Sequence, residues 1–235
     1  MIEDGILFLL IVIVGVLVGG HLLYAITNFK HIPSLFEKVE FKVWLDRLML
    51  VFGGAVFYGG LFGGIFAAGI AGKILHLDMT LWSDLMTPII PVFHAFGRIG
   101  CFFAGCCYGI ESKFGFIVHN NEYVPSINGV VRFPVQLLEA GCNIVLAVVM
   151  FYLLAKRDNE KIKGNLIYIY LISYGVIRFA DEFLRGDSIR GFVGFLSTSQ
   201  FISIISVTVS VILLYKSLKD KSTPKAKLDN TSNMV

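Results

Sequence analysis

Long apolar stretches alternate with short polar segments along the whole chain, and this alternation is the first guide to the fold. Six stretches predict membrane-spanning helices, at residues 5–26, 48–75, 85–107, 134–155, 164–185 and 192–215. A helix needs about 20 apolar residues to cross the roughly 30 Å of hydrocarbon in a bilayer. The pattern therefore predicts an all-α, polytopic helical bundle in the membrane, with a single transmembrane domain over residues 1–215.

The polar segments between these stretches predict connectors and one larger loop. Residues 28–47 form a mixed-charge connector, and residues 108–132 form a polar loop outside the membrane. Pro88 and Pro91 lie inside the third stretch, so that helix should be kinked or broken. Residues 216–235 are polar and basic, and we expect a disordered tail there.

Composition supports a membrane protein and argues against a nucleic-acid-binding one. Hydrophobic residues make up 56% of the chain and charged residues 16%, against about 25% charged in typical soluble domains. The mean hydropathy is +0.75. The net charge is only +3, and no basic face with interleaved aromatic residues is visible, so no nucleic-acid partner is expected. The first residues lack a basic region and a cleavage site, which predicts an uncleaved helix.

Basic residues predict the orientation of the bundle. They cluster at residues 156–163 and in the tail, and such clusters mark the cytoplasmic side. Counting spans from there places both termini in the cytoplasm and the 108–132 loop outside. The basic residues of the 28–47 connector oppose this assignment, because they would lie outside.

Charged residues inside the fifth stretch are the strongest functional signal. Each costs about 2.5–3.5 kcal/mol or more to insert, so such residues usually have a function. Tyr174, Arg178, Glu182 and Arg185 are spaced four, four and three apart, which places them on one helix face. The simpler interpretation is an internal Arg178–Glu182 ion pair with a second arginine that reaches the interface. Two arginines exceed what one glutamate balances, which favours binding of an anion.

Two further segments carry similar residues on the same predicted side. Arg98 lies between Gly97 and Gly100, which allow a ligand or another backbone to approach its guanidinium. That planar group can hold phosphate oxygens in a bidentate way. Gln136 and Glu139 share a helix face just inside the membrane. Together the three segments predict a site for a phospholipid head group.

These segments, in this order, resemble a known family. The carrying motifs are Gly97-Arg98-Ile-Gly100, Pro134-x-Gln136-Leu-x-Glu139 and Tyr174-Gly-x-x-Arg178-Phe-x-x-Glu182-Phe-x-Arg185. Two more segments, Phe57-Tyr58-Gly59-Gly60-Leu61-Phe62-Gly63 and Ser197-Thr-Ser-Gln200, are similar to its His-Gly-Gly-Leu motif and to the start of its final helix. The chain is identified over residues 5–215 as similar to the bacterial prolipoprotein diacylglyceryl transferase family.

The resemblance implies a reaction and roles for particular residues. Family members transfer the diacylglyceryl group of phosphatidylglycerol to a lipobox cysteine of a prolipoprotein, at the outer face of the bacterial inner membrane. Glycerol phosphate leaves, and no metal or organic cofactor is implied. Arg98 and Arg178 would bind the phosphate and stabilise the leaving group, with Glu139, Glu182 and Tyr174 as orienting groups. The expected substrate-binding residues are Arg98, Gln136, Tyr174, Arg178 and Arg185, together with Gly59, Gly60, Gly97 and Gly100.

Three features depart from the family. Tyr58 replaces the family histidine, and a phenol with a pKa near 10 is a poor base at neutral pH. Cys101 and Cys106 replace an asparagine and a glutamate, and the first span resembles the second helix of typical members. His94, on the Arg98 face, and His21 are candidate replacement bases, although for His94 a hydrogen bond within the bundle is the simpler interpretation. Two other functions stay open: a diverged transferase with a non-protein acceptor, and a phospholipid-binding protein without catalysis.

The cysteines allow several interpretations. Cys101, Cys106 and Cys107 cluster, whereas Cys142 stands alone in an apolar stretch. Packing by small side chains is the simplest interpretation of the cluster. A disulfide is an alternative on an oxidising side of the membrane. No further histidine or cysteine completes a familiar metal-binding spacing, so no metal is expected, and nothing in the sequence supports a nucleophilic role.

Overall fold

The structure, a computed structural model, describes residues 2–119, 121, 125–187 and 192–222 of the chain. Five helices in this part are long and apolar enough to cross a membrane, at Glu3–Thr27, Phe57–Ile74, Met79–Phe103, Val135–Ala155 and Thr198–Ser222. The prediction of a polytopic helical membrane protein is therefore confirmed. The remaining expected span, the fifth stretch, contains a shorter helix, α7 (Leu166–Asp181), which packs against both α6 and α8.

The chain forms two compact units, Met1–Met79 and Thr80–Val235, and each is described by itself. The first unit contains α1 (Ile2–Thr27), the 3₁₀ helix η1 (Phe29–Phe36), α2 (Phe41–Phe52) and α3 (Phe57–Ile74). The second contains α4 (Met79–Met86), apart from its first residue, which belongs to the first unit. It continues with α5 (Ile89–Phe103), α6 (Val135–Ala155), α7 and α8 (Thr198–Ser222).

Glycines join α1 to α3 in the first unit. A Cβ added to Gly59 would clash with the carbonyl oxygen of Gly19, and one added to Gly63 would clash with that of Gly15. Backbones this close gain van der Waals contact that larger side chains would prevent. Gly60 also faces α1, because an added Cβ would lie 3.2 Å from the Val16 carbonyl oxygen. Gly59 and Gly60, expected to bind substrate, thus have a packing role.

The second predicted span, residues 48–75, is wrong in its first part. The helix α2 ends at Phe52, the chain turns, and α3 begins at Phe57, so α2 combines the last part of the connector with the start of that stretch. His21 Nδ1 lies 2.7 Å from the Phe52 carbonyl oxygen, and the Val56 N–H donates to Gly20 O at 3.0 Å. His21 therefore bonds the carbonyl of the last residue of α2, which has no partner within that helix.

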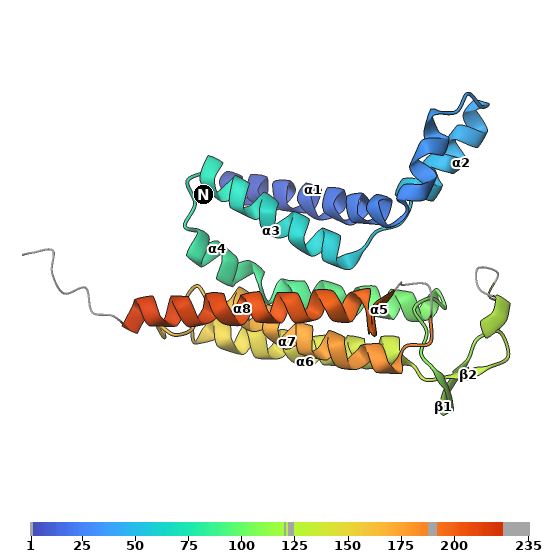
Figure 1. Ribbon diagram of the computed structural model, residues 1–235. Coiled ribbons are helices and arrows are strands. Elements are labelled where there is room, and N and C mark those ends of the chain that lie inside the picture. Colours follow the sequence, from blue (N-terminus) through green and yellow to red (C-terminus); the bar gives the residue numbers. More distant parts are fainter. Residues whose placement is uncertain (1, 120, 122–124, 188–191, 223–235) are drawn as a thin grey trace, which may run out of the picture. The chain divides into compact units, whose positions relative to one another are not determined.

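In the second unit, α5 packs on α6, α6 on α7, and α7 on α8, and Figure 1 shows these helices running side by side. The predicted break at the prolines is confirmed, because Thr87 and Pro88 separate α4 from α5. The helix of the third stretch ends at Phe103, before the predicted end at Cys107. Gly105, two residues past this helix end, takes a left-handed conformation (φ 67°). The fifth stretch changes from α-helix to the 3₁₀ turn η3 (Glu182–Leu184).

The last predicted span begins too early and ends too early. Its first residues form a short antiparallel hairpin of β3 (Phe192–Val193) and β4 (Leu196–Ser197), and the helix α8 starts only at Thr198. The Ser197 N–H donates to Gln200 Oε1 and the Gln200 N–H donates to Ser197 Oγ, both at 3.1 Å. This reciprocal capping box fixes the helix start. At its other end α8 continues to Ser222, so residues 216–222 of the expected disordered tail are helical, and residues 223–235 lie outside the described part.

The polar loop at residues 108–132 contains more structure than its composition indicates. β1 (Glu111–Ile117) pairs antiparallel with β2 (Val131–Arg132), with Ile117 opposite Val131 and an irregularity between Glu111 and Phe116. The 3₁₀ turn η2 (Pro125–Ile127) lies between the strands. Gly109 forms an isolated antiparallel bridge with Arg185, which joins this loop to the end of α7.

Candidate functional site

Glu139 on α6 is the centre of a buried cluster of charged side chains. Its Oε1 lies 2.9 Å from Arg98 Nη2 and 3.4 Å from His94 Nε2, and its Oε2 lies 3.9 Å from Arg185 Nη1. Arg98 and His94 come from successive turns of α5, as their four-residue spacing predicted. Glu139 is fully buried, so three cationic or potentially cationic groups from two other segments meet one carboxylate inside the bundle.

The contacts around Glu139 are close but poorly aligned. Among the described protein groups, neither Glu139 oxygen accepts a hydrogen bond of good geometry. Arg98 Nε and Arg178 Nη1 likewise have no hydrogen-bond partner there, although both are buried atoms. Leaving such groups unsatisfied costs about 1–3 kcal/mol each, and more for charged groups. The cluster therefore has spare donors and acceptors for a ligand that carries oxygens and hydroxyls.

Tyr174 and Arg178 on α7 and Glu182 at the start of η3 meet this cluster, so the face expected on one helix is shared by α7 and the turn that follows it. Arg178 Nη2 lies 2.7 Å from Glu182 Oε2 and donates to Ser199 Oγ at 2.9 Å. Tyr174 Oη is 3.5 Å from His94 Nε2, and the two rings meet edge to face with centroids 4.8 Å apart. The predicted Arg178–Glu182 pair thus exists, within a larger network that also includes α5 and α8.

Two partners in this network were not singled out from the sequence. Ser199 lies in the first turn of α8, two residues past the capping Ser197, and this position aims its hydroxyl at Arg178. Asp187 forms a forked pair with Arg185, whose Nε and Nη2 lie 3.2 and 3.1 Å from the carboxylate oxygens. Burial raises the pKa of Asp187, while Arg185 opposes that shift.

Asp187 changes the charge balance that the sequence indicated. Arg98, Arg178 and Arg185 each lie within ion-pair distance of a carboxylate, namely Glu139, Glu182 and Asp187 respectively. The expected excess of positive charge on the α7 face was therefore overestimated. What remains for an anion is the unfilled hydrogen-bonding capacity of Arg98 and Arg178, since a guanidinium carries five N–H donors and each makes only some of its bonds here.

Gln136 and the two glycines beside Arg98 have different surroundings. Gln136 donates from Nε2 to the Cys106 carbonyl at 2.7 Å, so it anchors the segment that follows α5. An added Cβ at Gly97 or at Gly100 would meet no atom within 4 Å. The space beside Arg98 is therefore open on its glycine side, as the motif predicted.

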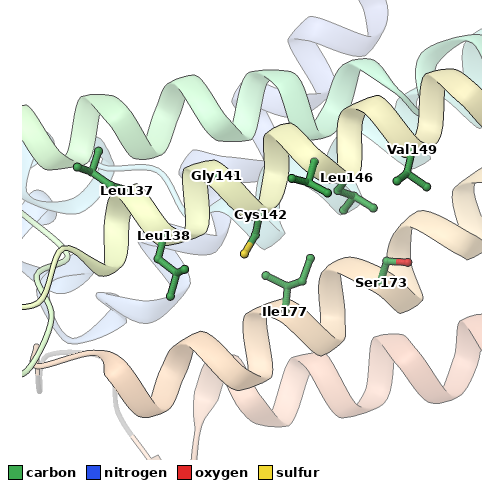
Figure 2. A pocket seen from close by; sticks show the side chains of 9 residues that line it. Leu137, Leu138, Gly141, Cys142, Leu146, Val149, Ser173 and Ile177 are labelled. Atoms are coloured by element: carbon green, nitrogen blue, oxygen red, sulfur yellow. The ribbon is translucent and has the colours of Figure 1, made fainter.

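A groove lies on the surface between α6 and α7. Its volume is about 570 Å³, and Figure 2 shows the side chains that line it, which are almost entirely apolar. Leu138 and Ile177 in its lining are the sequence neighbours of Glu139 and Arg178, but the charged side chains themselves are not among the lining residues. An acyl chain has the chemistry that such a lining accepts.

A family model described as prolipoprotein diacylglyceryl transferase matches residues 2–216 of this chain. The chain belongs to this family. The phosphatidylglycerol–prolipoprotein diacylglyceryl transferase of Clostridium tetani is 36% identical over 217 residues, which cover 90% of this chain and 80% of the relative. A second such transferase, from Clostridium perfringens, is 38% identical over 213 residues, covering 88% of this chain and 75% of the relative. One from Rickettsia felis is 31% identical over 221 residues, covering 93% and 79%.

The prolipoprotein diacylglyceryl transferase family was therefore predicted correctly from the motifs. Tyr58, which the motif resemblance aligns with a family histidine, lies in α3. Its side chain is buried in the first unit, edge to face with Phe57 and stacked on Phe62 at centroid distances of 5.8 and 6.1 Å. An aromatic setting of this kind suits a packing residue.

Proposed function

We propose that this protein transfers the diacylglyceryl group of phosphatidylglycerol to the cysteine thiol of a prolipoprotein lipobox and releases glycerol phosphate. The observation that carries the proposal is the buried cluster of Glu139 with Arg98, His94 and Arg185, whose donors are incompletely used. The names of the related transferases state the same substrates. We place the reaction in the bacterial inner membrane, with both termini in the cytoplasm and the charged cluster toward the outer face.

The reaction needs a group that stabilises the departing phosphate. The thiol sulfur attacks the glyceryl carbon that carries the phosphate, the carbon–oxygen bond breaks, and its electron pair remains on the phosphate. Arg98 and Arg178 supply the spare N–H donors that would bind this group and stabilise its growing charge. Glu139 and Glu182 hold the two guanidiniums in place, and the groove between α6 and α7 receives an acyl chain.

The thiol must lose its proton during the attack, and His94 is our candidate acceptor. Its Nε2 lies 3.4 Å from Glu139 Oε1 and 3.5 Å from the Tyr174 hydroxyl. Glu139 would orient the imidazole and stabilise its protonated form, which is the role a carboxylate plays beside a catalytic histidine. His94 would thus take over the task that Tyr58, with its phenol, performs poorly.

Reconstitution tests the whole proposal. The purified full-length protein in vesicles with phosphatidylglycerol should add one diacylglyceryl group to a lipobox peptide, detected by mass spectrometry. A peptide with serine in place of the cysteine should stay unmodified, and Arg98→Ala should slow the reaction by about 10²–10³-fold. An unchanged peptide, in vesicles where phosphatidylglycerol binds normally, would overturn the proposal.

Tyr58 favours a second candidate, a phospholipid-dependent protein without this acceptor or without catalysis. In that case phosphatidylglycerol would be bound, or consumed by another acceptor, while the lipobox peptide gains no mass. Tyr58→His separates the candidates: increased peptide modification supports the transferase scaffold. No change, together with loss of lipid binding in Arg98→Ala and Arg178→Ala, supports a binding protein.

A further inference from the structure

Three cysteines at the end of α5 form a thiol cluster that the proposed reaction does not use. The Sγ atoms of Cys101, Cys106 and Cys107 all lie within 4.8 Å of one another. All three are free thiols; Cys101 and Cys107 are half-buried and Cys106 is exposed. The thiol cluster is therefore compact and within reach of solutes.

The way α5 ends brings the first two thiols together. The Cys106 N–H donates to the Cys101 carbonyl at 3.1 Å, and the Gly105 N–H donates to the Phe102 carbonyl at 3.1 Å. With Gly105 at φ 67°, these bonds form a Schellman motif. Side chains at the positions of Cys101 and Cys106 regularly touch in this motif, so the helix end itself sets their proximity.

The third thiol is directed to the same place by an unusual backbone conformation. Cys107 has φ 55°, in the left-handed region, which costs a residue other than glycine about 1–3 kcal/mol. The surrounding chain is held on both sides: Gln136 donates to the Cys106 carbonyl at 2.7 Å, and the Gly186 N–H donates to the Tyr108 carbonyl at 3.0 Å. The convergence of three thiols is thus imposed by the fold and does not depend on flexible side chains alone.

We propose that the thiol cluster binds one soft, thiolate-preferring metal ion such as Zn²⁺. Sulfurs at about 2.3 Å from a common tetrahedral ion lie about 3.8 Å apart, so the observed separations need only a small contraction. A disulfide would use two of the sulfurs and leave the third beside it, whereas a metal uses all three. Thiolate ligands select Zn²⁺ and Cu⁺ over Mg²⁺ and Ca²⁺.

Nearby charge suits this ion. The guanidiniums of Arg98 and Arg185 both interact electrostatically with the Cys107 sulfur. Three thiolates with one divalent cation carry a net charge of minus one, and the two guanidiniums lie beside it although each also pairs with a carboxylate. The ion would retain an open fourth position for water, and each sulfur–metal bond would release the thiol proton.

Metal titration of the reduced, metal-free full-length protein in detergent tests the proposal. Zn²⁺ should bind at one ion per chain, measured by elemental analysis, and Cd²⁺ should produce the ultraviolet thiolate charge-transfer band. Bound Zn²⁺ should also protect three of the four cysteines from maleimide labelling, leaving Cys142 as the reactive one. These readouts do not depend on transferase activity.

Single substitutions identify the ligands. Cys101→Ser, Cys106→Ser and Cys107→Ser should each weaken Zn²⁺ binding by at least about tenfold, the size of effect that second-shell changes already produce. Cys142→Ser, the matched control, should leave it unchanged. Absence of stoichiometric binding, equal binding in all four variants, or a stable mass loss of two hydrogens without metal uptake would overturn the proposal, the last in favour of a disulfide.

Discussion

Asp84 and Glu139 are fully buried carboxylates of the second unit, and they are satisfied in different ways. Asp84 Oδ2 accepts hydrogen bonds from Arg157 Nε at 2.9 Å and from the Gly164 N–H at 2.7 Å. Glu139 is just as buried and lies near three cationic or potentially cationic groups, yet it accepts no aligned hydrogen bond among the described residues. The two carboxylates have the same burial and the same charge, so neither property distinguishes the two sites.

Alignment is what separates them. Two well-formed hydrogen bonds to one oxygen make Asp84 a cross-link between α4 and the turn that joins α6 to α7, even though its other oxygen has no partner in the described part. Around Glu139 the charged groups lie close together, but part of their hydrogen-bonding capacity is unused, as in sites that are preorganised for a ligand. A buried charge therefore indicates function when its neighbours are close and incompletely bonded.

Arg98→Ala is expected to give the largest effect. It removes spare donors from the site, so kcat/KM should fall about 10²–10³-fold, the loss seen when one stabilising donor is removed. Reconstituted transfer to a lipobox peptide measures it. Arg157→Ala is the matched control, which should lower thermal stability and leave the activity of the folded protein intact; equal activity losses in both variants would contradict the comparison.

Asp84→Asn should have the largest effect on stability. It leaves the Arg157 charge without its partner, which costs roughly 3–5 kcal/mol for a fully buried pair. The loss should lie at or below the lower end of that range, because the Arg157 side chain is 23% exposed. Thermal unfolding in detergent measures this loss, and an unchanged midpoint would show that Asp84 is no cross-link.

His94→Gln should lower kcat by about 10²-fold, the lower end of what a general base contributes. The KM for phosphatidylglycerol should change little, because the arginines are intact. Substitution of His21, which bonds a helix-end carbonyl, is the control and should affect stability more than turnover. A rise in KM with kcat unchanged would make His94 a binding residue and leave the base to be found elsewhere.

Ser199→Ala should give the smallest effect. It removes one hydrogen bond to Arg178, and such bonds to charged groups contribute about 1.5–3 kcal/mol. Glu182 still holds the guanidinium, so the loss in kcat/KM should be about tenfold, at the low end. Thr208→Ala, which removes a hydroxyl bonded only within α8, should leave activity within about twofold.

The sequence predicted the membrane class, the family and the residues of the charged face, because charge in an apolar stretch is rare and the three- and four-residue spacing is clear. It did not predict where helices end. The end of α5 depends on a left-handed Gly105, and the start of α8 depends on a capping box that reads as ordinary polar residues.

Contacts that depend on the conformation of a turn were equally hidden. Asp187 lies beyond the last charged residue of the predicted face, and its forked pair with Arg185 follows from the turn after η3. The spacing of the three cysteines is not a familiar metal-binding pattern, and it does not report the turn that brings their sulfurs together.

The uncharged lengths of α6 and α7 bear on bilayer thickness. Between Arg178 and Asn165 the uncharged part of α7, residues 166–177, spans about 18 Å, and residues 140–155 of α6 span about 24 Å. Both fall short of the roughly 30 Å of hydrocarbon in a typical bilayer. The charged cluster thus lies below the level of the surrounding head groups, and a substrate lipid must sink toward it or the bilayer must thin locally. Acyl-chain length in the host membrane therefore becomes a variable that tunes how readily the lipid reaches its site.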